Sequence, residues 1–435
     1  MKFKILSLFI IIFLFLTVVG RSQQSAKDSL SLQDAINLTL QNQPLIEQAL
    51  EQVNAADAKI KQQDSYYYPK INGYLSYARI GPTPSIDFGG NNFELAPANN
   101  YNAHITAYQL VYDFGQRDAE VDLYKSYKIS SLDKLILIKN NLTYQTVQLF
   151  YAILFLRKSV DVKDEQINNL NRHLEVTTKK YESGSATDFD ILTTKVRIAD
   201  TENQKIEIVN ALNKYEIKLR TVLNLPSDYQ LNLTGKFTVD SLNTDSATLL
   251  NTAFQNRPEM KLARDAEQSS IVSKQVASFT NIPTLSVLAD YGLTNGYQPN
   301  IDVLRGNWVF GINATIPIFD GNLKDATVEE AEANIKSSSA NIQSVERDVK
   351  VDVEQAFQDL KANKLKIGTT EVQVEQAVEA VSRAELQYQY GVITNLDIID
   401  SETSLAQARL LYLQSQYKYI ISNYQLKKAI GETLF

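Results

Sequence analysis

The chain has 435 residues, a formal net charge of −7, no cysteine and two histidines. Without cysteine, a disulfide framework, a thiolate nucleophile and a cysteine metal site are excluded. The two histidines, His104 and His173, are too few to favour a metal centre or a Ser-His-Asp triad, and the residues around them are those of solvated positions. The mild acidic balance lacks the clustered lysine and arginine that a nucleic-acid partner requires. Composition thus predicts no cofactor and disfavours an enzyme.

The first twenty residues have the pattern of a targeting signal. A lysine-containing start precedes the apolar run 5–19, and the segment ends in the small residue Gly20. This pattern is typical of a secretory signal peptide. The alternative, a membrane anchor, needs about 20 apolar residues. We therefore predict that residues 1–20 are a signal peptide and that the mature chain is exported.

The remainder of the chain contains an internal sequence repeat. A constant offset of 207 positions relates Tyr181, Gly184, Thr187, Asp190 and Ile191 to Tyr388, Gly391, Thr394, Asp397 and Ile398. We predict two repeats, residues 21–227 and 228–435, each with the order helix, strand, strand, long helix, helix.

The predicted helices come first and last in each repeat. Ser31 can cap a helix that runs to about residue 65, and its counterpart runs from about 245 to 277. No proline interrupts 116–182 or 323–389, which predicts two helices of roughly 100 Å. Apolar residues at coiled-coil spacing along 342–360 and 208–222 predict helices that pack in pairs.

The predicted strands follow Pro69 and Pro283. In the second repeat, apolar and polar residues alternate from 284 to 294 and from 308 to 318, which predicts strands with one apolar and one polar face. This pattern fits either a half-buried sheet or outer-membrane strands of about 9–11 residues. The tyrosines near the first pair fit an interfacial girdle or ordinary strand propensity. Four strands cannot close a barrel in lipid, whereas three copies would supply twelve.

Several motifs carry a family resemblance over nearly the whole mature chain. They are Asn-x-Pro at Asn42 and Asn256, the strand-to-helix junctions Asp113-Phe114-Gly115-x-Arg117 and Asp320-Gly321-x-x-Lys324, the tip motifs Tyr181-x-x-Gly184 and Tyr388-x-x-Gly391, and the ending Ala429-Ile430-Gly431. On these motifs the chain resembles the TolC-like outer-membrane efflux proteins. The resemblance implies a mainly α fold with a membrane β-barrel portion. Long antiparallel coiled-coil helices would form a trimeric α-barrel, joined to a 12-stranded β-barrel with four strands from each chain.

The resemblance also implies a function and its partners. The homotrimer would be the exit duct of a tripartite efflux or type I secretion system in the bacterial outer membrane, with a long periplasmic extension. It would contact outer-membrane lipid, a periplasmic adaptor that opens the helix tips, and an inner-membrane transporter of the RND, ABC or MFS class. The alternative is a secreted trimeric coiled-coil stalk that conducts nothing. A hydrolase using Asp397 and Asp400 is a distant third, because an exposed helix face lacks an enclosed pocket.

Asp397 and Asp400 are the predicted channel constriction and cation site. They lie three residues apart on one helix face. In a threefold assembly they would form two carboxylate rings, which select cations. The alternative is a helix N-terminal acid that complements the helix dipole.

The remaining predicted site residues belong to the tips. By resemblance, Asp190 and Tyr388 link neighbouring hairpins in the closed state, although Tyr388 could instead be core packing. Some members of the family have a basic residue two positions after the second tip glycine. This chain has Ile393 at that position, so a salt bridge from there to Asp190 is not available. The predicted rim, where an adaptor would dock, consists of Ser183, Gly184, Tyr390 and Gly391; turn chemistry alone would also explain the glycines.

Overall fold

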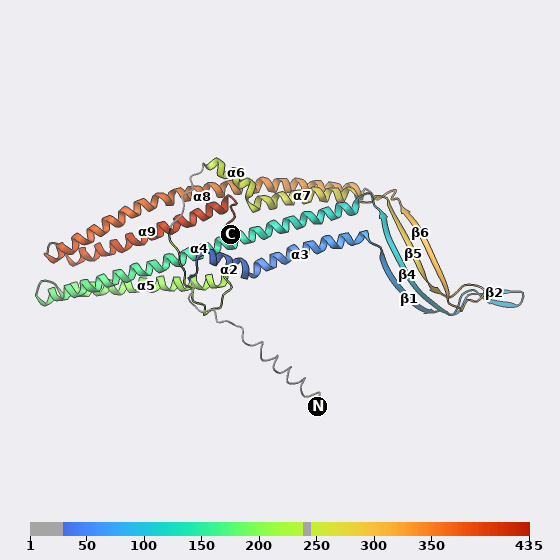
Figure 1. Ribbon diagram of the computed structural model, residues 1–435, viewed down its shortest axis with the longest axis horizontal. Helices are drawn as coiled ribbons and strands as arrows, with labels where there is room; N and C mark the ends of the chain where they lie inside the picture. Colours follow the sequence, from blue (N-terminus) through green and yellow to red (C-terminus); the bar gives the residue numbers. More distant parts are fainter. Residues whose placement is uncertain (1–28, 238–244) are drawn as a thin grey trace, which may run out of the picture. The chain divides into compact units, whose positions relative to one another are not determined.

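The computed structural model describes residues 29–237 and 245–435. The predicted signal peptide, residues 1–20, lies outside this described part. The first half contains helices α2 (Leu32–Asn42) and α3 (Pro44–Asp64), the 3-10 turn η1 (Ser65–Tyr67), strands β1 (Lys70–Arg79), β2 (Ser85–Phe88), β3 (Asn91–Glu94) and β4 (Asn99–Tyr112), and helices α4 (Gln116–Glu182) and α5 (Asp188–Val222). The second contains α6 (Ser246–Asn256), α7 (Pro258–Ser278), β5 (Thr284–Thr294), β6 (Arg305–Thr315), α8 (Leu323–Gln389) and α9 (Asn395–Ala429) (Figure 1).

The helix lengths of the two halves agree. Helices α2 to α5 have 11, 21, 67 and 35 residues, and α6 to α9 have the same lengths in the same order. Both 67-residue helices begin and end at the predicted residues. The β2–β3 hairpin lies between β1 and β4, whereas β5 and β6 are joined by residues 295–304. The helix order fits the proposed duplication, whose boundaries stay a prediction.

The prediction of one continuous helix before each strand pair is wrong. Each splits at a proline, giving α2 and α3 in the first half and α6 and α7 in the second. Gln43 and Arg257, the residues before the prolines, are extended, with ψ of 119° and 127°. The proline ring disfavours helical geometry at the preceding residue and lacks an N–H to continue the helix. The predicted cap at Ser31 is confirmed, and it forms a capping box with Asp34.

The chain forms two compact units, each assembled from three separate segments. One, here called the tip unit, contains the described residues 29–43, 142–237 and 362–421. The other, the sheet unit, contains the described residues 44–141, 245–361 and 422–435. Neither unit therefore coincides with one of the predicted repeats.

The tip unit is held together by apolar faces of its helices. The fully buried side chains include Phe150, Ile153, Leu219, Ile399 and Ile420. Helix α2 is attached to α4 by a hydrogen bond of 2.8 Å between the hydroxyls of Thr39 and Thr146, which are both fully buried. The tip unit is thus a helical bundle with an apolar interior.

The sheet unit contains a four-stranded antiparallel sheet and its own helical core. The strand order is β1-β4-β5-β6, so the β4–β5 pairing joins the two halves of the chain. The apolar stripe predicted along 342–360 is confirmed, because Val349, Val353 and Ala356 are almost fully buried. Met260 of α7 and Leu426 of α9 are also fully buried in this unit.

The predicted alternation of the strands is confirmed by the register. Tyr291 lies opposite Ile105 and Trp308 on one face, while Asp290 lies opposite Thr106 on the other. The apolar face is left uncovered by the described residues, because Leu75 is 83% exposed and Trp308 is 74% exposed. The predicted strand to residue 318 is too long, because β6 ends at Thr315.

His104 is not solvated as predicted. Its Nδ1 atom lies 2.7 Å from Oδ1 of Asp290, and the hydroxyl of Thr106 donates to Oδ2 of Asp290 at 2.7 Å. The imidazole lies across Gly292, where a Cβ atom would sit 2.7 Å from that Nδ1. The polar face therefore contains a built His–Asp–Thr cluster that requires a glycine beneath it.

Within the described ranges, 29–237 and 245–435, no helix combines the length and apolar character needed to cross a bilayer.

Candidate functional site

The two helix tips of the tip unit have the same turn. Helices α4 and α8 each end in a Schellman motif, with a glycine of positive φ just past the last helical turn. At the end of α4, the amide of Gly184 donates to the carbonyl of Tyr181 at 2.9 Å, and the amide of Ser185 donates to the carbonyl of Lys180 at 2.6 Å. At the end of α8, the amide of Gly391 donates to the carbonyl of Tyr388 at 3.1 Å, and the amide of Val392 donates to the carbonyl of Gln387 at 2.9 Å. The Tyr-x-x-Gly motifs therefore encode these helix ends.

The helices that follow the turns begin with capping boxes. Oδ2 of Asp190 accepts hydrogen bonds from the amide and hydroxyl of Thr187, each at 2.8 Å. Oδ2 of Asp397 accepts the same bonds from Thr394 at 2.8 and 2.6 Å. The bonds from Thr394 hold the pKa of Asp397 below its usual value. Within one chain, both carboxylates therefore serve as local caps.

Asp400 lies in the next turn of α9 and has a different environment. Its side chain is 59% exposed, and Oδ1 lies 3.5 Å from Nη2 of Arg197 on α5. Asp397 is also exposed. The structure therefore leaves both predicted constriction residues accessible from outside the chain, and their arrangement in rings stays a prediction.

Asn395 connects the second tip to the first. Only 5% exposed, it donates from Nδ2 to the carbonyl of Asp190 at 3.1 Å and to the hydroxyl of Thr194 at 3.3 Å. Its Oδ1 lies 2.6 Å from Nε2 of His173. The sequence reasoning missed this residue, although Asn395 departs from its repeat counterpart, Asp188, which was an available signal.

His173 is buried rather than solvated, so that prediction is wrong. It is 6% exposed, and burial lowers its pKa, which favours the neutral ring. Because Nδ2 of Asn395 is used as a donor, its Oδ1 accepts the proton carried on Nε2 of His173. The imidazole is thus a fixed neutral donor between α4 and α9.

Tyr388 is buried beside this histidine. Its ring centroid lies 4.9 Å from that of His173, and Nζ of Lys180 lies 4.3 Å from the tyrosine centroid. Its hydroxyl lies 3.2 Å from that of Thr177, and burial raises its pKa. Lys180 also donates to the backbone carbonyl of Tyr388.

These contacts place the predicted closure residues without joining them directly. Within the chain, the carboxylate of Asp190 binds Thr187 and the phenol of Tyr388 contacts Thr177. Ile393 packs against the apolar cluster of Ala384, Tyr388 and Ile398. Within the single chain, Tyr388 therefore packs in the core, as the alternative interpretation expected. A link from Tyr388 to a neighbouring copy stays a prediction.

The predicted rim residues lie at the exposed ends of the tips. Ser183, Gly184 and Gly391 are exposed, and Tyr390 is 82% exposed. A Cβ atom at Gly184 or Gly391 would meet no other atom within 4 Å. The rim is therefore open to a partner.

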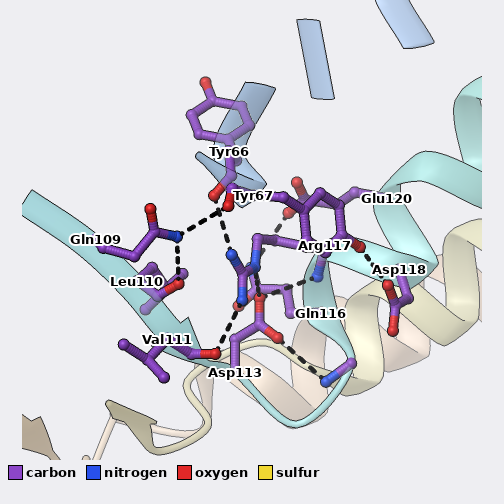
Figure 2. A network of polar contacts seen from close by, with 11 residues as sticks. Tyr66, Tyr67, Gln109, Leu110, Val111, Asp113, Gln116, Arg117, Asp118 and Glu120 are labelled. Atoms are coloured by element: carbon purple, nitrogen blue, oxygen red, sulfur yellow. Dashed lines mark hydrogen bonds and ion pairs between the residues drawn. The ribbon is translucent and has the colours of Figure 1, made fainter. Parts of the chain in front are cut away.

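In the sheet unit, the motif residues Asp113 and Arg117 build the junction between β4 and α4. Figure 2 shows the two side chains meeting, with Nε of Arg117 2.6 Å from Oδ2 of Asp113. Arg117 also donates to the carbonyls of Tyr66 at 2.9 Å and Val111 at 3.4 Å. The guanidinium thus ties the end of η1 to the end of β4, which fixes where the strand becomes a helix.

The second junction uses its aspartate in the same way. The carboxylate of Asp320 accepts from the amides of Asn322 and Lys324 at 3.0 and 3.1 Å. Both motifs are therefore structural, capping the long helix that follows each strand pair.

Comparison with known proteins agrees with this architecture. The sequence model of the family described as "Outer membrane efflux protein" matches residues 35–225 and 249–432. Outer membrane protein TolC of Salmonella enteritidis is 22% identical over 308 residues, which cover 67% of this chain and 61% of that protein. The cation efflux system protein CusC of Escherichia coli (strain K12) is 22% identical over 409 residues, covering 91% and 85%.

A solved structure shares the fold. The crystal structure of the Campylobacter jejuni CmeC outer membrane channel superposes with a TM-score of 0.79 at 16% identity, covering 95% of this chain and 91% of that one. The family match covers most of the chain, in two segments that contain the two tips. The chain therefore belongs to the outer membrane efflux protein family and is a bacterial outer-membrane protein with a periplasmic extension.

Proposed function

We propose that this protein acts as a homotrimeric exit duct of a tripartite efflux or type I secretion system. The observation that carries the proposal is the two-faced sheet. Its apolar face, with Trp308, Phe310 and Ile312 each more than 60% exposed, suits lipid, and its polar face suits an aqueous lumen. The outer strands β1 and β6 each have one edge without a partner in the sheet. Pairing of these edges between three copies would close a twelve-stranded barrel.

The helices favour the same assembly. Large apolar side chains remain exposed along them, including Phe189 at 75%, Val196 at 69% and Leu365 at 68%. Burial of such side chains stabilises helix association, so neighbouring copies are the natural partners in a trimeric α-barrel. A non-conducting stalk would also bury the helices, but it gives no reason for an exposed apolar sheet.

The tips would control passage. A periplasmic adaptor would dock on Ser183, Gly184, Tyr390 and Gly391, which are all exposed in the described part of the chain. An inner-membrane RND, ABC or MFS transporter would supply the cargo. Asp190 and Tyr388 would belong to the contacts that open when the adaptor binds, together with the bridge of Asn395.

The constriction would consist of Asp397 and Asp400 from three copies. Both side chains are exposed in the single chain, so they are free to face a common lumen. Two adjacent rings of three carboxylates would favour cations and bind a multivalent cation. The capping role of Asp397 does not oppose this, because only its Oδ2 atom binds Thr394 and its Oδ1 atom remains available.

Planar-bilayer conductance of the purified protein tests the proposal. We expect small, cation-selective pores that a trivalent cation blocks, and loss of block in a variant carrying Asp397→Asn and Asp400→Asn. Asp161→Asn is the matched control, because Asp161 is an exposed acid far from the tips in sequence, and its block should persist. Identical block in both variants would refute the constriction. A folded trimer that never conducts, even with Tyr388→Ala at the tips, would refute the duct and favour the stalk.

A further inference from the structure

A cavity of about 210 Å³ lies within the tip unit between helices α4, α8 and α9. Its lining includes Arg172 and Val176 of α4, Glu385 and Tyr388 of α8, and Ile398 and Glu402 of α9. Arg172 and Glu385 are exposed, whereas Tyr388, Ile398 and Glu402 are buried. The cavity therefore has a charged outer part and an inner part with apolar walls and one carboxyl group.

Glu402 is the unexplained group in this cavity. The residue is 5% exposed, and its Oε2 atom has no hydrogen-bond partner among the described residues. Buried polar atoms are normally paired, because an unpaired one loses its hydration without compensation. Burial raises the pKa of Glu402 to about 7, with a further contribution from the negative charge of Glu385. An ionised Glu402 thus lacks a counter-ion.

The neighbouring charged groups do not supply one. Arg172 exerts only a weaker, opposing effect on the pKa of Glu402, and its Nη2 donates to Asn169. His173 is neutral and committed to Asn395. Lys180 lies over the ring of Tyr388 and binds its carbonyl, and Asp190 caps α5. Among the described residues, none of these groups forms a hydrogen bond or ion pair with Oε2 of Glu402.

We propose that this cavity binds a small tertiary ammonium ion, whose single N–H donates to the carboxylate of Glu402. The unpaired Oε2 atom of Glu402 can accept this N–H, and the alkyl groups would lie against Val176, Ile398 and the ring of Tyr388. A metal ion fits less well, because no group of three His, Asp or Glu side chains in the described ranges could hold one. The site goes beyond the exit-duct proposal and does not depend on it.

Triethylammonium is the probe, measured by titration calorimetry on the purified full-length protein at pH 8. We expect one site per chain. Tetraethylammonium carries the same charge but no N–H, and it should bind about tenfold more weakly. Sodium chloride at equal ionic strength should give no saturable heat. Binding of triethylammonium should weaken as the pH falls below 7, because Glu402 then takes up a proton.

Variants separate this site from general charge effects. Glu402→Gln keeps the shape of the side chain and should weaken binding at least about tenfold. Asp161→Asn removes an exposed charge of the same unit that does not line the cavity, and it should leave affinity unchanged. Arg172→Gln removes a competing cation at the cavity and should strengthen binding a few-fold.

The proposal is overturned if Glu402→Gln, shown to be folded by its helical circular dichroism, binds triethylammonium as tightly as the wild type. It is also overturned if tetraethylammonium binds equally well, or if no saturable binding occurs at pH 8. None of these outcomes depends on conductance, so they leave the duct proposal unaffected.

Discussion

The two helix tips share a backbone but not an environment. Both have a Schellman turn followed by a Thr–Asp capping box. At matching positions, however, Tyr181 is 47% exposed and Tyr388 is 6% exposed. Asp188 is exposed, whereas its counterpart Asn395 is 5% exposed. Local sequence therefore determines how each hairpin turns, and contacts between the hairpins determine which of two equivalent side chains becomes buried.

The next turn shows the same asymmetry in charge. Glu402 is buried where the first tip has the exposed Lys195. The buried polar side chains therefore belong mainly to the second tip. The first tip contributes groups that bind them, such as the carbonyl of Asp190 and the hydroxyl of Thr194. Matched substitutions at equivalent positions can test this division.

The largest expected difference is at Glu402. The folded carboxyl keeps its proton to about pH 7, whereas the unfolded chain releases it near 4.5. The folded state therefore binds more protons between these values, and its stability falls as the pH rises from about 4.5 to 7. Glu402→Gln should remove this loss, stabilising α9 relative to the wild type by about 3 kcal/mol more at pH 8 than at pH 4.

Hydrogen exchange of the amides of Ile398–Thr403, after correction for intrinsic exchange rates, measures this difference. Lys195→Gln leaves Glu402 in place and is the matched control, so it should keep the pH dependence of the wild type. A wild-type pH dependence that survives in Glu402→Gln would contradict the assignment.

Asn395→Ala should have the next largest effect. It removes both donors to the first tip and leaves the buried His173 without its acceptor, which should cost about 2 kcal/mol in the free energy of opening of the tip. Asp188→Ala, at the matching exposed position, should cost only about 0.5 kcal/mol through the helix dipole. Limited proteolysis at the tips and hydrogen exchange can rank the two variants; equal losses would mean that the bridge is not specific to the second tip.

A smaller contrast is expected between the tyrosines. Tyr388→Phe leaves the ring in place but removes the buried contact with Thr177, which should cost about 1 kcal/mol. Tyr181→Phe should be nearly neutral, because that side chain is half exposed. Thermal unfolding followed by circular dichroism gives the comparison, and a reversed order would show that the two environments have been misassigned.

The capping threonines should show no contrast. Thr187→Ala and Thr394→Ala each remove a side-chain cap, at an expected cost of about 1 kcal/mol apiece. Hydrogen exchange in the first turns of α5 and α9 should respond equally. Unequal losses would show that the tips differ in their backbone as well as in their surroundings.

Much of the architecture follows from local patterns in the sequence. The absence of proline over 116–182 and 323–389 predicts α4 and α8 to the residue, and Tyr-x-x-Gly followed by Thr-x-x-Asp predicts both turns. The split at Pro44 could also have been predicted, because the residue before a proline avoids helical geometry. These features depend on residues close together in the chain.

The interior of the second tip could not be predicted in this way. His173 and Asn395 are 222 positions apart, and each alone resembles an ordinary polar residue on a helix. Glu402 follows the more conspicuous Asp397 and Asp400 but differs from both in being buried. Only the packing of three helices shows which acid lies inside and which two lie outside.

The segments of the two units alternate along the sequence, so the core of the sheet unit depends on residues that are far apart in the chain. The sheet unit needs residues 422–435 as well as segments from near the beginning and the middle. Leu426, supplied last, is fully buried in the same unit as Met260 and Val353. A chain cut short before this point would expose that core, however well its earlier segments form helices. Folding of the sheet unit therefore requires residues 422–435, and we expect a chain truncated before them to populate an unfolded state that proteases can attack.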